Sequence, residues 1–406
     1  MSLETVVMFE STDAGAPVLT GQAGTLVFLL DKCLVDGYGQ VTLASLAQTG
    51  GVATATTSAA HGFKSHQIVE IAGATPAAYN GKHRITVTSP TAFTFAVEGA
   101  TASPASGTIT AKRPSLGWSR HFASTNQACY RPQPGSNQMY LRVNDNNAGA
   151  EQRVAYVAGF ESMVAFEDAG NGLKFPTSAQ RGGVAYDLSW HKSTAQDATV
   201  RPWVLVGNGR IFWLLIEEVG GTNTNLYNLN FFGDVLSYKP GDAYGTVIAG
   251  SYRNEPNSGE TVYSRNVSPT NFGGENYSTT FLARSFSQIG SSALAGVFGI
   301  FQSAQNANNN TVNISHFGRT NSIPYPSPLD NGAALLPGYV TGSGQYLRGV
   351  MPGFYCDPHQ ENSFFSGDML SNVTGLEGRR FRRFVTASRA HSSRGGFWLD
   401  VTGPWT

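Results

Sequence analysis

The stretch PWVLVGNGRIFWLLIEE, residues 202–218, decides the class of fold. Two apolar runs flank Asn208-Gly209, a dipeptide that strongly signals a tight turn between antiparallel strands. Neither run alternates between apolar and polar residues, so both faces of this hairpin are expected to be buried. The chain should therefore contain a β-hairpin that is covered on both sides.

Further strands are predicted across the main body, residues 113–406. The candidates combine β-branched and aromatic residues between turn signals; they are QMYLRVND, RVAYVAGF, GVAYDLSWH, GTVIAGSY and GFWLDVTG. SSALAGVFGIFQSAQ fits a strand pair or a short helix, and strand is the favoured interpretation. NSIPYPSPLDNGAALLPGYV, residues 321–340, carries frequent prolines and is predicted to run as extended, loop-like chain outside a sheet.

One helix is predicted near the N-terminus. Apolar residues recur there at helical spacing, at Leu26, Leu29, Leu30, Cys33 and Leu34. Gly37 follows directly and suits a C-terminal cap. This helix needs another element to pack against.

The composition changes between residues 48 and 112. Short β-prone pieces alternate with turn residues there, which is typical of a small Ig-like β-sandwich; the pieces are VATATTS, QIVEIAG, HRITVTS, FTFAVEG and GTITA. Asn80-Gly81 predicts a hairpin among them. We therefore predict a mainly β protein with a β-rich body, residues 1–47 and 113–406, one N-terminal helix, and an inserted sandwich at residues 48–112.

Charge is scarce and balanced. Charged residues make up 13% of the chain, and Lys+Arg and Asp+Glu number 27 each. This composition gives no general attraction to nucleic acid or to an anionic membrane, and little repulsion between copies. Cys33, Cys129 and Cys356 predict no disulfide framework. The N-terminus lacks a signal-peptide pattern and the apolar runs are too short to span a bilayer, so we expect synthesis in a cytoplasm and no membrane partner.

Three histidines, His61, His66 and His83, lie close enough in sequence to suggest a metal site. Only Glu70 stands nearby to complete one. The favoured interpretation places the three imidazoles on the surface of the module, while Gly62 forms a turn and Phe63 fills the core.

Two other groups contain residue types used in catalysis. YCDPHQE gathers a thiol, an imidazole and two carboxyls, at Cys356, Asp357, His359 and Glu361. Neighbouring residues point in different directions, however, which favours a polar loop. Asp234 and Asp242 could form the carboxylate pair of a glycosidase, but aspartate at a turn also bonds to the backbone. We expect no catalytic residue, no cofactor and no metal.

The basic cluster GRRFRRF could bind nucleic acid through charge and stacking. In a strand, Phe381 would face the core and its arginine neighbours the solvent. Arginine also pairs bidentately with carboxylates, so ion pairs within or between chains are favoured over nucleic acid. The candidate interface residues come from this cluster and from the proline-rich segment 322–340; they are Arg379, Arg380, Arg382, Arg383, Pro324, Tyr325, Pro326 and Pro328.

Several phrases, in this order, resemble a family of tailed-bacteriophage virion structural proteins. They are MFESTDAGAPVLTGQAGTLVFLLDKCLVDGYG, FGDVLSYKPGDAY, YLRGVMPGFYCDPH and FWLDVTGPW. Residues 50–112, through their HGF, YNG and FTF phrases, resemble a β module of phage tail and fibre proteins. The resemblance implies a virion component that is assembled in the bacterial cytoplasm, and it brings no catalytic residues. It does not fix the position on the particle; we favour the tail, baseplate or neck. Its partners would be copies of itself and other virion proteins.

Two further classes of function stay open on the residues alone. In one, the inserted module binds a host receptor or a glycan. In the other, which ranks lower, the chain hydrolyses a cell-wall or capsule polymer. For a structural protein, decoration of the phage head is a less favoured alternative to the tail, baseplate or neck.

Overall fold

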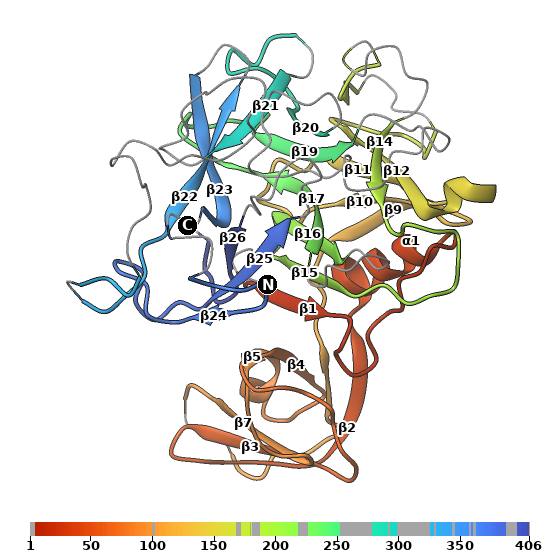
Figure 1. Ribbon diagram of the computed structural model, residues 1–406. Helices are drawn as coiled ribbons and strands as arrows, with labels where there is room; N and C mark the ends of the chain where they lie inside the picture. The colour runs from red at the N-terminus through yellow and green to blue at the C-terminus, as the bar shows by residue number, and fades with distance from the viewer. Residues whose placement is uncertain are drawn as a thin grey trace.

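The computed structural model confirms a mainly β chain with one short α-helix near the N-terminus. It describes residues 5–99, 102–167, 172–178, 180, 187–217, 226–251, 278–290, 293–298, 325–328, 330–342, 346–356, 359, 363–386 and 396–405. No helix in these ranges is long and apolar enough to cross a membrane. The strands divide into a large body and a seven-stranded module that lies below it in Figure 1.

The body contains nineteen of the described strands. In chain order they are β1 (Val7–Glu10), β9 (Ser119–Ser124), β10 (Gln127–Arg131), β11 (Tyr140–Asn144), β12 (Val154–Phe160), β13 (Lys174–Phe175), β14 (Leu188–His191), β15 (Trp203–Gly207), β16 (Ile211–Glu217), β17 (Leu226–Asp234), β18 (Leu236–Ser237), β19 (Thr246–Ser251), β20 (Ser278–Leu282), β21 (Ala293–Phe298), β22 (Leu336–Gly342), β23 (Tyr346–Cys356), β24 (Met369–Leu370), β25 (Phe381–Thr386) and β26 (Gly396–Asp400). The strands predicted from sequence in the body all coincide, at least in part, with members of this set.

The predicted central hairpin is confirmed as β15 and β16, which pair antiparallel from Trp203↔Ile216 to Gly207↔Phe212. At the turn, the Asn208 side chain accepts hydrogen bonds from the amides of Arg210 and Ile211. Alternate residues of the hairpin belong to two different cores. Phe212, Leu214 and Ile216 enter one core, whereas Ile211, Trp213 and Leu215 enter the other. Two-sided burial explains why these strands carry so few polar residues.

Eight strands form a closed circuit around the second core. Each pairs with the next in the order β17, β19, β20, β21, β22, β23, β26, β25, and β25 returns to pair parallel with β17. The first core lies on the other face of β15 and β16, where residues of β10 to β14 and the helix cover it.

The predicted helix is confirmed as α1 (Thr25–Leu30), which continues as a π-helical turn, η1 (Asp31–Asp36), and ends at Gly37. The five apolar residues of the predicted pattern are all buried. Asp145, in the loop after β11, fixes the start of this helix, because its carboxylate accepts the Leu26 amide at 2.9 Å. The same carboxylate forms a fully buried ion pair with Lys192.

The inserted module has two sheets over one core. Its strands are β2 (Tyr38–Thr49), β3 (Val52–Thr57), β4 (Ile68–Ala72), β5 (Gly81–Arg84), β6 (Thr86–Ser89), β7 (Ala92–Ala96) and β8 (Thr110–Arg113). Long strand β2 belongs to both sheets and changes register between Leu43 and Ser45. At the other corner, buried Ile85 separates β5 from β6, so one bent segment also joins the sheets.

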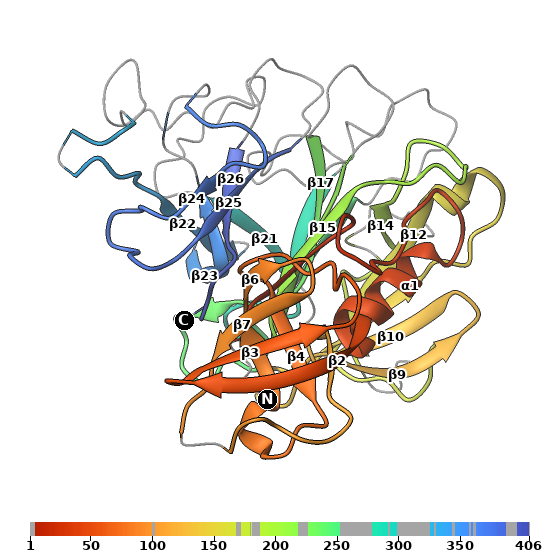
Figure 2. The ribbon, with the colours of Figure 1, turned by 90° about the horizontal axis from the view of Figure 1, so that it is seen from below.

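The ends of the module lie outside the expected limits of 48 and 112. Because β2 begins at Tyr38 and pairs there with Arg113 of β8, a division after residue 47 falls inside a strand. The chain therefore enters and leaves the module through adjacent strands, as Figures 1 and 2 show. Composition changes only where β2 leaves the body, which is why the sequence places the boundary late.

Two turn and loop predictions need correction. Asn80-Gly81 does not form a tight hairpin turn. A 3₁₀ turn, η2 (Ala77–Tyr79), precedes it, and Asn80 closes the longer loop by bonding to both the amide and the carbonyl of Ala74.

The proline-rich segment enters a sheet at its end, since β22 pairs with β21 and β23. Pro337 is tolerated because the pairing of β22 with β23 shifts register beside it.

The buried pair Asp145–Lys192 predicts a specific pattern of stability. Asp145→Ala should cost about 3–5 kcal/mol in the free energy of unfolding, because it leaves a buried ammonium without its carboxylate. The double variant Asp145→Leu/Lys192→Met should cost less than this single variant, since no unpaired charge then remains. Urea denaturation measures both. A double variant that is less stable than Asp145→Ala would contradict the prediction.

Candidate functional site

The module is fastened to the body at Asp13, whose side chain is 1% exposed. One oxygen accepts a hydrogen bond from the Gln67 amide nitrogen at 2.7 Å and lies 3.3 Å from the Lys64 ammonium. The other accepts the Tyr38 hydroxyl at 3.0 Å and lies 3.4 Å from Nε of Arg113. Four module side chains therefore converge on one carboxylate of the N-terminal segment.

Arg113 extends this junction into the body. Its buried guanidinium donates to the carbonyls of Ile68 in the module and Met8 in β1. It also lies over the Phe9 ring, 5.4 Å from the ring centre. Because the cation has partners on both sides, the module cannot tilt away without leaving a buried charge unpaired.

Glu10 provides a second polar contact between the parts. Its carboxylate pairs with Arg382 of β25 and lies 3.5 Å from Lys64. Burial alone would raise the pKa of Glu10, but these two cations outweigh it and hold the pKa below its ordinary value. Further along, Arg84 donates to the carbonyl of Thr402 near the C-terminus at 3.1 Å. The junction is therefore a broad set of charge-assisted hydrogen bonds.

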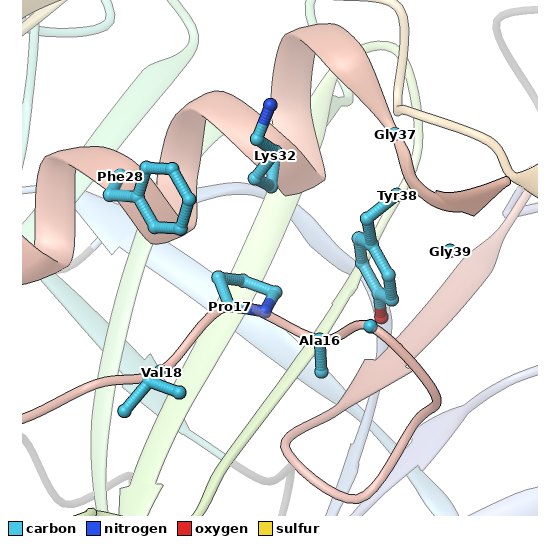
Figure 3. A pocket seen from close by; sticks show the side chains of 9 residues that line it. Ala16, Pro17, Val18, Phe28, Lys32, Gly37, Tyr38 and Gly39 are labelled. Carbon is cyan, nitrogen blue, oxygen red and sulfur yellow. The ribbon is translucent and has the colours of Figure 1, made fainter.

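A groove of about 590 Å³ opens beside this junction, between α1 and the preceding segment (Figure 3). Its lining is mostly apolar or glycine; the residues are Gly15, Ala16, Pro17, Val18, Phe28, Lys32, Gly37, Tyr38 and Gly39. Phe28 and Lys32 come from the helical segment, and Pro17 and Val18 come from the chain that runs beside it. Phe28 and Val18 are 51% and 53% exposed, respectively, so two large apolar side chains of this groove face solvent.

The glycine at the end of the helix is required by this geometry. Gly37 has a φ of +75°, and a Cβ there would lie 2.3 Å from the carbonyl oxygen of Arg113. Any other residue would push β8 away from the start of β2. The groove and the junction are thus held together by the same tight backbone contact.

The chemistry of the groove favours binding over catalysis. Among its lining side chains, only Lys32 and Tyr38 can ionise, and the Tyr38 hydroxyl is bound to Asp13. Lys32 lies over the Phe28 ring and pairs with Asp36 at 3.0 Å. An apolar wall with one cation at its edge suits an apolar segment that carries a negative charge.

The arginine cluster is largely engaged inside the chain. Arg379 pairs with Asp400 at 2.7 Å, and Arg382 pairs with Glu10. Arg383 is 3% exposed and donates to the carbonyl of Phe364 at 2.6 Å. Arg380 is half-buried, and its amide donates to the Thr402 hydroxyl. Arg379 and Arg382 therefore form ion pairs within the chain, which is the intramolecular alternative of the prediction. Their charges are less available to a partner.

The described part of the proline-rich segment lies on the surface. Tyr325 is 40% exposed, and Pro326 and Pro328 are exposed as well. The Tyr325 ring packs against Phe364 with a centroid distance of 4.3 Å. Pro324 lies outside the described residues.

The three histidines of the module do not come together around one point. His61 is 3% exposed, so its expected surface position is wrong. Its ring stacks on Phe63 and accepts the Phe63 amide, which makes it part of the core that this phenylalanine fills. His83 is half-buried against Phe95, and His66 is exposed. His61 is buried because its own hydrogen bond closes the turn at Gly62.

Asp234 and Asp242 have different structural partners. Asp234 is buried and accepts hydrogen bonds from Thr246 and from the amide of Asn137, each at 2.7 Å. Burial raises its pKa despite these bonds. Asp242 forms a bidentate pair with Arg348 at 2.7 and 2.8 Å. Burial alone would raise the pKa of Asp242, but the hydrogen bonds from its partners outweigh it and lower the pKa.

The YCDPHQE loop is described only in part. Cys356 ends β23, and Nε2 of His359 accepts the amide of Ala334 at 3.1 Å. Asp357 and Glu361 lie outside the described residues. The imidazole therefore fixes the backbone that leads into β22.

Sequence reasoning missed both the junction and the groove. Phe28 gave a usable signal, because it is an apolar residue on the helix face opposite the buried leucines. Asp13, Lys64 and Gln67 gave none, since their partners lie on segments that only the fold brings together. Compared with known proteins, the chain matches no protein-family model and no curated protein.

Removing the central carboxylate of the junction should loosen the module. We expect Asp13→Ala to cost about 3 kcal/mol in the free energy of unfolding, because Arg113 stays buried without its carboxylate. Asp36→Ala removes an exposed ion pair and should cost about 0.5 kcal/mol or less. Hydrogen exchange in β2 and β8 gives the readout. Unchanged protection of these strands in Asp13→Ala would count against the assigned role.

Asp242 and Asp234 should respond to pH in opposite directions. The stabilising contribution of Asp242 is present above the unfolded pKa and is lost as the pH falls through its lower folded pKa. That of Asp234 is present below the unfolded pKa and is lost as the pH rises through its raised folded pKa. Between about pH 3 and pH 7, the cost of Asp242→Asn should grow and that of Asp234→Asn should shrink. Denaturation curves across this range measure both, and parallel profiles would refute the assignment.

Proposed function

We propose that the chain is a structural component of a tailed-phage particle, in the tail, baseplate or neck, which assembles through protein–protein contacts. The ordered phrases that resemble phage virion proteins give the class of particle. The structure supports a contact-making role through the distribution of its charges.

The observation that carries the proposal is that three ion pairs are buried inside the chain while several large apolar side chains stay exposed. The most buried pairs join Asp13 with Arg113, Asp145 with Lys192 and Asp242 with Arg348, all with side chains at most 1% exposed. The exposed large apolar side chains of the body include Val18, Phe28, Tyr238, Ile289, Leu347 and Phe365.

Such a surface suits repeated contacts in a symmetric assembly. Exposed apolar groups mark interaction sites, and few surface charges reduce repulsion between copies. Many weak contacts then sum to a stable ring or tube. The module, fixed rigidly through Asp13 and Arg113, would project a second contact surface at a defined angle.

Purified particles of the phage that encodes the chain provide the direct test. We expect mass spectrometry of intact particles to find the chain in many copies, and density at a symmetric position in the tail, baseplate or neck. Its absence from intact virions would refute the proposal.

The role of the module can be tested separately. Residues 42–110 can be replaced by Asn-Gly, because Val41 and Ala111 face each other across β2 and β8. This replacement keeps Tyr38 and Arg113 in place beside Asp13. We expect the shortened chain to fail to build stable particles if the module makes a structural contact. Particles that assemble but no longer adsorb to cells would instead identify the module as a receptor or glycan binder.

A further inference from the structure

We propose that the groove between Val18 and Phe28 binds the segment Tyr325–Pro328 of a second copy of this chain. The proposal rests on the proposed function, because it names one contact through which copies would assemble. Three properties of the two surfaces carry it: uncovered apolar area, charge and relative position.

The groove exposes apolar surface where a helix should be polar. Phe28 lies on the face of α1 opposite Leu26, Leu29 and Leu30, which are buried in the core. A helix at a protein surface normally presents polar residues there. Across from it, Pro17 and Val18 add to the apolar wall. A partner that covers this wall would remove two large apolar side chains from water.

The segment Tyr325–Pro328 is suited to cover such a wall. Proline has no amide hydrogen, so burying Pro326 and Pro328 leaves no backbone donor unpaired at those positions. The segment is also held in place, since the Tyr325 ring packs on Phe364 and the Ser327 amide bonds to Gly332. A pre-ordered segment loses less conformational entropy on binding.

The charges of the two surfaces are complementary. Lys32 lines the groove, and Asp330 follows Pro328 by two residues and is exposed. Asp330 is held ionised, because hydrogen bonds from Thr374 and from the Gly332 amide lower its pKa. The present partner of Lys32 is Asp36, in an exposed pair that contributes little to stability. Lys32 can therefore turn towards a second carboxylate at small cost.

The relative position of the two surfaces selects a second copy as the partner. In both ribbon views, the segment that leads into β22 lies on the opposite side of the body from α1 (Figures 1 and 2). The segment of one copy therefore lies far from its own groove. A contact between different surfaces of two copies is heterologous, and its repetition builds a ring or a tube.

Disulfide trapping tests the contact directly. Val18→Cys and Ser327→Cys are made as separate variants, each with Cys356→Ser, and are then mixed under mild oxidation. We expect the mixture to form linked dimers about tenfold faster than either variant alone, because the contact raises the effective concentration of the two thiols. The matched control mixes Ser327→Cys with Val52→Cys, since Val52 is 48% exposed and Val18 53%. Equal rates in the two mixtures would overturn the proposal.

Association in solution gives a second measurement. Phe28→Lys should weaken self-association about tenfold, because docking would bury an unpaired ammonium. Val52→Lys, on the module, should leave association unchanged. Lys32→Glu should weaken it as well, and adding Asp330→Lys should restore part of the loss. Sedimentation velocity measures association, and thermal melting shows that each variant is folded. Equal association of Phe28→Lys and Val52→Lys would also overturn the proposal.

The outcomes separate this proposal from the proposed function. If intact particles contain the chain but no Val18–Ser327 link forms in them or in solution, the contact is wrong and the structural role stands. If the link forms in solution and virions lack the chain, the contact stands and the virion role fails. Particles built with Phe28→Lys could instead lack another virion protein while association between copies of this chain is unchanged. That result would assign the groove to the other protein and refute a second copy as its occupant.

Discussion

Two-sided burial of the central strands is the constraint on which the rest of the structure depends. Because β15 and β16 send alternate side chains into two cores, neither face can be left to solvent. One face requires the closed circuit of strands from β19 to β26. The other requires β10 to β14 and α1. The helix is thus a cover for the first core, and its position fixes the start of β2 and the direction in which the module leaves the body.

The positions of the buried ion pairs follow from the same arrangement of two cores and a module. A body with two cores and an attached module has many internal junctions, and the chain fills several of them with ion pairs. Asp145 with Lys192 anchors the helix, Asp242 with Arg348 holds the turn before β19 against β23, and Asp13 with Arg113 joins the module. A chain that has few charges and buries three ion pairs has fewer charges left on its surface. Such a surface is what the proposed assembly role needs.

Local sequence signals predicted the elements whose causes are local. The hairpin at Asn208-Gly209 forms because the turn and both flanking strands agree. The helix ends at Gly37 because only a glycine tolerates its backbone there. The hairpin at Asn80-Gly81 failed for a physical reason. The side chain of Asn80 bonds back to Ala74 and stabilises a longer loop, which competes with the two-residue turn. Pro337 entered a strand because a register shift removes the need for its missing amide.

The sequence by itself determined the β class, the single helix, the two-sided burial of the hairpin and the presence of a guest module between the two parts of the body. These features depend on periodicity and composition, which are properties of neighbouring residues. Only the tertiary structure decided that Asp13 is the centre of the junction, that His61 belongs to a core, and that Phe28 faces a groove. These features arise from residues far apart in the chain, and the physical reason is that a carboxylate or an aromatic ring takes its role from the partners that folding places beside it.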